Sequence, residues 1–156
     1  MRRFTHRFRA KAPINVVAAF HQDSRALKLL TPPPVFVQMH CVNPLSEGSI
    51  TDFTLWLGPL PVRWVAAHSE VDLLSGFTDT QIHGPFAFWV HRHSFQPCGS
   101  GETEVIDDIQ AEFGRGFSGL LGRLMWVNLP FMFFYRAWIT RRTIEKSLKL
   151  SGVAGR

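Results

Sequence analysis

Residues 76–95 read GFTDTQIHGPFAFWVHRHSF, and this stretch carries the pattern that decides the fold. Two runs that alternate with a period of two residues flank Gly84-Pro85, a turn signal, so we expect two antiparallel strands joined as a hairpin. One face of that hairpin combines large aromatic with ionisable side chains: Phe77, Asp79, Gln81, Trp89, His91, His93 and Phe95. A packed core avoids the polar groups and a solvated face avoids the aromatics, whereas the wall of a ligand cavity contains both.

The composition is that of one globular domain. The chain has 156 residues, of which 46% are hydrophobic and 19% are charged. We therefore treat residues 1–156 as a single domain that is long enough to bury a core. The 14 Phe and 5 Trp against 1 Tyr supply bulky apolar surface with few hydroxyl groups. That balance suits an apolar interior or pocket.

Positive charge is concentrated at the two ends of the chain. Residues 1–42 carry 7 Lys/Arg and 1 acid (net +6), residues 43–112 carry 2 and 10 (net −8), and residues 113–156 carry 8 and 1 (net +7). Such basic ends can attract anionic lipid or nucleic acid. We expect them instead to lie against the acidic middle and to offset its charge. No nucleic-acid-binding motif accompanies them, so we expect no nucleic-acid partner.

The cysteines and the absence of an apolar leader indicate a compartment. Cys41 and Cys98 form no CxxC pair, and no hydrophobic segment follows Met1. We expect a cytoplasmic protein with free thiols. The most apolar window, residues 120–139, is interrupted by two arginines, an asparagine and a proline. It falls short of the roughly 20 apolar residues that a membrane span needs.

The turn signals and the apolar spacing predict the order of the elements. Strands are expected over residues 3–10, 35–42, 49–58, 61–73, 77–83, 86–96 and 103–113. Two short helices follow the first strand, one beginning near Pro13 and one capped by Asp23 or Ser24. Beyond Gly116 the apolar spacing of 3 and 4 residues predicts a long helix that Pro130 kinks or divides. This order predicts an α+β domain in which a curved antiparallel sheet of about seven strands wraps around a long C-terminal helix.

With this order, the chain resembles the START-like superfamily, also called helix-grip, SRPBCC or polyketide cyclase/dehydrase-like proteins, and within it the bacterial ligand-binding branch. The similarity lies in FTHRFRAKAPINVVAAFHQD (residues 4–23), PLSEGS (44–49), GPLPVRW (58–64), the hairpin, and TEVIDD (103–108). It implies a deep, mostly apolar cavity between the sheet and the C-terminal helix. It implies no particular ligand, because a fold does not determine a function. The sequence matches no catalytic signature of the cyclases.

Pairing across the strands predicts a row of polar side chains on the hairpin face. A symmetric turn about Gly84-Pro85 sets Asp79 opposite His91, and a following turn centred on residue 99 sets His91 opposite Asp107. Flanking carboxylates favour the imidazolium, so this register predicts a raised pKa for His91. A shift of one residue in either turn would destroy the row.

Several roles are open for this row. We favour a satisfied polar network that holds the strand register. The row could also orient the polar head group of an apolar ligand, or His91 could act as a general acid or base. A metal site made by His91 and His93 with Asp79 or Asp107 is a further alternative. No second HxH motif and no Cys ligand supports it, and we expect neither a metal nor another cofactor.

We therefore predict a protein that binds, transports or senses a hydrophobic small molecule, such as a lipid, isoprenoid or polyketide-like compound. The candidate ligand-binding residues are Trp64, Phe77, Asp79, Gln81, Trp89, His91, His93, Phe95, Asp107, Phe131, Tyr135 and Trp138. A cyclase or dehydratase that uses His91 as acid or base is the less expected alternative. Another is a peripheral membrane module, because the apolar residues 124–134 precede Arg136, Arg141 and Arg142.

Overall fold

The computed structural model describes residues 1–23, 25–150 and 152, in which seven strands form one antiparallel sheet. The strands are β1 (Arg2–Ala10), β2 (Phe36–Val42), β3 (Ile50–Leu57), β4 (Leu60–Asp72), β5 (Gly76–His83), β6 (Phe86–Pro97) and β7 (Thr103–Phe113). The helices are α1 (Ile14–Gln22), α2 (Arg25–Leu29), α3 (Gly116–Val127) and α4 (Leu129–Leu150). Each predicted strand is confirmed, with both of its ends within one residue of the prediction.

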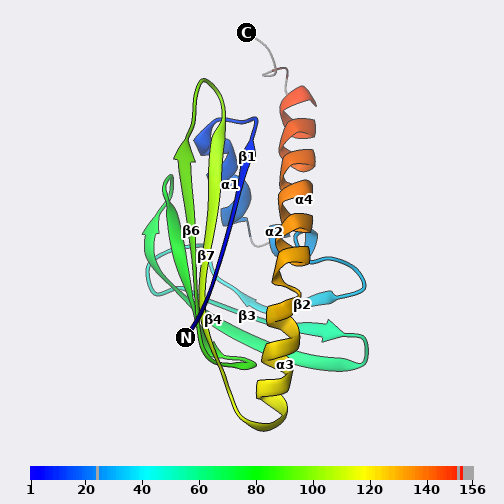
Figure 1. Cartoon of the computed structure of the whole chain (residues 1–156). Coiled ribbons are helices and arrows are strands. Elements are labelled where there is room, and N and C mark those ends of the chain that lie inside the picture. The colour runs from blue at the N-terminus through cyan, green and yellow to red at the C-terminus, as the bar shows by residue number, and fades with distance from the viewer. Residues whose placement is uncertain (24, 151, 153–156) are drawn as a thin grey trace.

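The sheet order is β1-β7-β6-β5-β4-β3-β2. The first strand, β1, therefore forms one edge of the sheet and pairs with the last strand, β7. Figure 1 shows β1, β6 and β7 running alongside α4, whereas β2, β3 and β4 turn away and cross the molecule near α3. This curvature lets one sheet cover both the long helix and the junction between α3 and α4. The predicted helix-grip arrangement is confirmed.

The inner face of the sheet follows from alternation along its strands. In β6, Trp89, His91, His93 and Phe95 are buried, and the residues between them are more exposed. Two clusters of buried side chains fill the space beneath the helices. One contains Phe8, Val17, Phe95, Ala137 and Ile144, and the other contains Phe53, Trp64, Trp89, Ile109 and Phe133. The sheet therefore has one face packed against the helices.

The long helix is divided at Asn128, as Pro130 predicts. The axes of α3 and α4 differ by 50°. The Asn128 backbone N–H donates to the Met125 carbonyl at 3.2 Å, and its Nδ2 donates to the Leu124 carbonyl at 2.7 Å, which ends α3. Pro130 lies in the first turn of α4, where its missing N–H costs no intrahelical hydrogen bond.

Smaller features also follow the sequence pattern. The Asp23 carboxylate accepts a hydrogen bond from the Arg25 backbone N–H at 2.9 Å and so caps α2, whereas Ser24, the other candidate cap, lies outside the described residues. Both cysteines are free. No single helix in the described part of the chain is long and apolar enough to cross a membrane. Helices α3 and α4 reach that length and apolarity only when taken together, and they are bent relative to each other.

Candidate functional site

A cavity of about 520 Å³ lies between the sheet and the helices. Its walls come from β2 to β6, from α2 with the proline-rich segment after it, and from the junction of α3 with α4. Aromatic and aliphatic side chains such as Phe53, Leu55, Trp64, Leu129 and Phe133 make up most of the lining. Its volume falls in the range of small-molecule sites, roughly 300–1,000 Å³.

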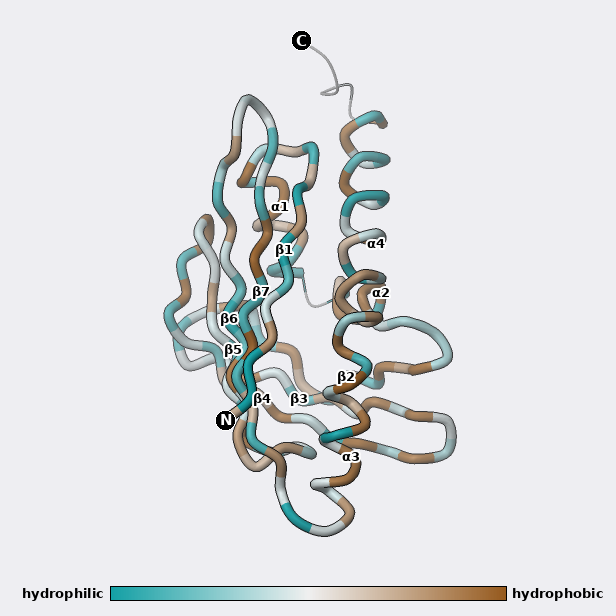
Figure 2. The backbone as a smooth tube through the Cα atoms, in the orientation of Figure 1, coloured by the Kyte–Doolittle hydropathy of each residue, from teal (hydrophilic) through white to brown (hydrophobic). Residues whose placement is uncertain are grey.

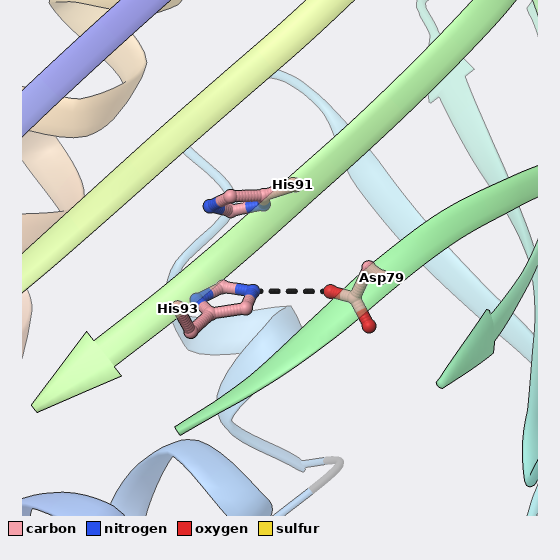
Figure 3. Close-up of side chains that lie close together, drawn as sticks. All are labelled: Asp79, His91 and His93. Carbon is pink, nitrogen blue, oxygen red and sulfur yellow. Dashed lines mark hydrogen bonds and ion pairs between the residues drawn. The ribbon is translucent and has the colours of Figure 1, made fainter. Parts of the chain in front are cut away.

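Five ionisable side chains from four adjacent strands form a connected network at one wall of the cavity. His93 Nε2 donates to Asp79 Oδ2 at 3.0 Å (Figure 3), and His91 Nε2 donates to Asp107 Oδ1 at 2.9 Å. Two further contacts, His68 Nε2 to Asp79 Oδ1 at 3.1 Å and His93 Nδ1 to Asp107 Oδ1 at 3.0 Å, have ion-pair distances without hydrogen-bond geometry. The network therefore runs from β4 through β5 and β6 to β7.

The predicted polar row is confirmed at one end and wrong at the other. Asp79 lies opposite His91 as predicted. Asp107, however, lies opposite His93, and His91 lies opposite Ile109. The β6–β7 hairpin turns one residue later than predicted, and that change displaces the register by two residues. Because side chains alternate with a period of two, Asp107 keeps its face but exchanges its partner.

This register moves the positive charge from His91 to His93. Burial alone would lower the pKa of His93, but the close contacts with the carboxylates of Asp107 and Asp79 outweigh it and raise the pKa to about 9. Burial and the charge of His93 instead lower the pKa of His91 to about 4. The prediction of a raised pKa for His91 is therefore wrong. Burial opposes ionisation of both carboxyl groups, yet hydrogen bonds from the histidines hold their pKa values well below the usual range.

The neutral His91 presents one free acceptor. An ionised carboxylate only accepts hydrogen bonds, so contact with Asp107 places the His91 proton on Nε2 and leaves a lone pair on Nδ1. Among the described residues Nδ1 has no hydrogen-bond partner, and the ring is part of the cavity wall. Chemically, this nitrogen can accept a hydrogen bond or a proton from a group in the cavity.

The same region brings three potential metal ligands close together. One ligand atom from each of Asp79, His91 and His93 lies within 4.8 Å of the others (Figure 3). Both nitrogens of His93 face carboxylate oxygens, which is the environment of an imidazolium rather than of a metal-bound imidazole. A metal would have to displace that proton. The expectation that no metal binds stays a prediction.

The cavity contains seven of the twelve candidate ligand-binding residues. These are Trp64, Phe77, Asp79, Trp89, His91, His93 and Phe131. Asp107 is buried behind the histidines, and Gln81 donates to the Phe86 carbonyl at 2.9 Å within the hairpin. Phe95 packs against the His21 ring in the core, with 5.0 Å between ring centroids. Tyr135 and Trp138 pair with each other on α4, outside the cavity lining.

Sequence analysis missed three basic side chains that line the cavity: His21, His68 and Arg136. His68 could have been found, because it follows Trp64 at even spacing on β4 and so shares its face. The His68 ring also lies 3.0 Å, through Nδ1, from the Ser49 backbone carbonyl. His21 donates through Nδ1 to the Val17 carbonyl at 2.8 Å, and burial lowers its pKa to about 4.

Comparison with known proteins supports the fold and leaves the activity open. No family profile and no curated protein matches the sequence. The solved structures that align with this chain include three with TM-scores of 0.65–0.70. A START superfamily protein from Mycobacterium smegmatis is 12% identical, with a TM-score of 0.65, over 92% of this chain and 97% of that one. The Zhui aromatase/cyclase from Streptomyces sp. R1128 is 12% identical, with a TM-score of 0.70, over 99% of both chains.

A third structure is longer than this chain. A nucleoside-diphosphate sugar epimerase from Corynebacterium glutamicum is 25% identical, with a TM-score of 0.66, over 91% of this chain but only 29% of its own length. This chain thus corresponds to less than a third of that protein. The sheet order, the position of the divided C-terminal helix and these likenesses agree with one another. The protein has the START-like, helix-grip fold.

Proposed function

We propose that this protein binds a hydrophobic small molecule, such as a lipid, isoprenoid or polyketide-like compound, and carries or senses it. The observation that carries the proposal is the cavity of about 520 Å³, in which apolar walls surround one polar network. Apolar walls provide affinity, and a small number of polar groups fix the orientation of the ligand. The likeness to a protein named as an aromatase/cyclase supports a small molecule as the occupant.

Two matched variants of β4 test this proposal. Ala66 is buried and lines the cavity, whereas its neighbour Ala67 points to the opposite face of the sheet and is outside the lining. We expect Ala66→Phe to weaken the binding of the neutral fluorescent probe N-phenyl-1-naphthylamine at least tenfold, because the added ring occupies the cavity. Ala67→Phe should leave probe binding unchanged.

Native mass spectrometry of protein purified from cells provides a second test, since a bound compound would add a defined mass. Failure of the wild-type protein to take up either the probe or a cellular compound would overturn the proposal. Equal probe affinity in the two variants would do so as well, because the probe would then bind elsewhere. Circular dichroism confirms that both variants fold.

A second candidate function is docking at an anionic lipid surface, and it rests on the outer face of α3 and α4. Seven apolar residues follow each other there at spacings of 3 and 4, and each is between 48% and 70% exposed. They are Phe117, Leu120, Leu124, Val127, Phe131, Phe134 and Trp138, which we call the α3–α4 stripe. Figure 2 shows the apolar character of α3 and of the first turns of α4.

The position of the α3–α4 stripe favours a lipid surface. Leu124 and Phe131 belong to the stripe and also line the cavity, so the stripe adjoins the cavity. The next positions at the same spacing are Arg141 and Arg142, and Arg142 lies over the Trp138 ring at 5.5 Å. An apolar face that continues into cations matches the interface of an anionic bilayer.

Liposome co-sedimentation tests this second function. We expect the wild-type protein to sediment with vesicles that contain phosphatidylserine and Phe134→Glu to stay in the supernatant. Phe36→Glu is the control, because Phe36 is equally exposed at 70% but lies on β2, outside the stripe. Equal sedimentation of the two variants would reject the docking surface. A dimer that only Phe134→Glu dissociates would assign the stripe to a second copy of the chain.

A further inference from the structure

Arg136 on α4 is a cation of the cavity wall that forms no ion pair with any group in the described part of the chain. Its side chain lines the cavity, and its Nε is buried without a hydrogen-bond partner. Among the described residues, no carboxylate lies within 4.0 Å of the guanidinium and no hydrogen bond to it exists. Its close neighbour is the Phe133 ring, whose centroid lies 5.1 Å from the guanidinium carbon. A buried charge is costly unless it is paired.

The two carboxylates of the network are already engaged. Asp79 contacts His68 and His93, and Asp107 contacts His91 and His93. They act on Arg136 only at longer range, where their charges partly offset the lowering of its pKa by burial. The guanidinium therefore keeps its N–H donors available at the boundary between the network and the apolar walls.

We propose that Arg136 binds the carboxylate of a ligand whose apolar body fills the cavity, an inference that rests on the proposed function. A guanidinium offers two parallel N–H donors that match the two oxygens of a carboxylate. Most of the cavity lining, including Phe133 and Met132 from the same helix, is apolar. The ligand class is accordingly an apolar carboxylic acid, and the Arg136 side chain fixes which end of it faces the histidines.

Competition between two ligands of one chain length tests the proposal. Decanoate and decanol are titrated against bound N-phenyl-1-naphthylamine at about pH 8, where a carboxylic acid is ionised. We expect wild-type protein to bind decanoate at least tenfold more tightly than decanol. Arg136→Met should retain the affinity for the probe and for decanol and lose the preference for decanoate.

Arg123→Met is the matched control. Arg123 is an exposed cation of α3 that also lies over an aromatic ring, at 5.3 Å from the Phe113 centroid, and it is outside the cavity lining. Its variant has the same net charge as Arg136→Met, and we expect it to keep the tenfold preference. Decanoate should also raise the melting temperature of the wild type and of Arg123→Met, but not of Arg136→Met.

The outcomes separate this proposal from the one on which it rests. Equal affinity of the wild type for decanoate and decanol, or a preserved preference in Arg136→Met, would overturn the role of Arg136 while probe binding left the cavity function intact. No binding of probe, alcohol or acid by the wild type would overturn the cavity function itself. If Arg136→Met does not fold, Arg136→Gln replaces it, because glutamine keeps a polar side chain but removes the positive charge. We expect Arg136→Gln to lose the preference for decanoate as well.

Discussion

His93 should make this protein less stable as the pH rises from about 6.5 to about 9. In the folded chain the carboxylates of Asp107 and Asp79 raise the pKa of His93 to about 9, although burial opposes them. In the unfolded chain the pKa is near 6.5. Between these values the folded protein keeps a proton that the unfolded chain has released. Each pH unit then removes about 1.4 kcal/mol from the free energy of unfolding, or about 3 kcal/mol in all.

Two neutral substitutions isolate this effect. Urea unfolding, followed by tryptophan fluorescence at intervals from about pH 6 to 10, gives the free energy of unfolding for each variant. His93→Gln should lack the loss of about 3 kcal/mol, because glutamine does not titrate. His91→Gln should keep it, because His91 is already neutral in this range. Groups outside the network titrate alike in all three proteins and cancel in the comparison.

The difference in stability between wild type and His93→Gln is the decisive quantity. It should be largest near pH 6.5 and shrink by about 3 kcal/mol toward pH 9. A difference that stays constant over this range would refute the assignment of the charge to His93. Loss of the slope in His91→Gln instead would place the charge on His91.

Three further outcomes are expected. At neutral pH, ¹H–¹⁵N NMR spectra recorded through the long-range couplings of the imidazole rings should show both ring nitrogens of His93 protonated. The same spectra should show a neutral His91 with its proton on Nε2. Two neutral rings would contradict the network. Phe133→Ala should cost about 3–5 kcal/mol in urea unfolding, because its ring is buried against His91, and a cost under about 1 kcal/mol would show loose packing. Gly76→Ala should melt well below Gly101→Ala, because only at Gly76 would a Cβ meet the His93 backbone carbonyl; similar melting temperatures would disprove this close contact.

The strands were predictable because their alternation is strong and their turns are chemically marked. Trp89, His91, His93 and Phe95 all face inward on β6, as the period of two requires. The division of the C-terminal helix was also predictable, since proline is tolerated in a first turn but not in a helix interior. These features depend on residues close together in the chain.

The pairing of Asp107 was not predictable, because it depends on the loop between β6 and β7. The Cys98 N–H donates to the Glu102 carbonyl at 2.9 Å, and both Gly99 and Gly101 have positive φ, so the turn is centred on residue 100. A loop with two glycines can close in more than one way, and the sequence does not choose between them. The identity of the charged histidine depends on that choice.

The role of Arg136 depends on how α4 is rotated. Arg136, Arg141 and Arg142 lie close together in a basic segment, but only Arg136 lines the cavity. The rotation is set by packing against β1 and α1, which the helical period alone does not reveal. For the same reason Trp138, a predicted ligand contact, lies on the exposed face instead.

The length of the loop between β6 and β7 influences which histidine lies opposite Asp107. Inserting two residues between Cys98 and Glu102, with the turn still beginning after Cys98, would slide β7 by two positions and bring Asp107 opposite His91, with every side chain still on its original face. His91 would then lie between the two carboxylates and would carry the proton. Chains that share this fold can therefore exchange which histidine is the cation by loop insertion or deletion alone, with no substitution inside the cavity.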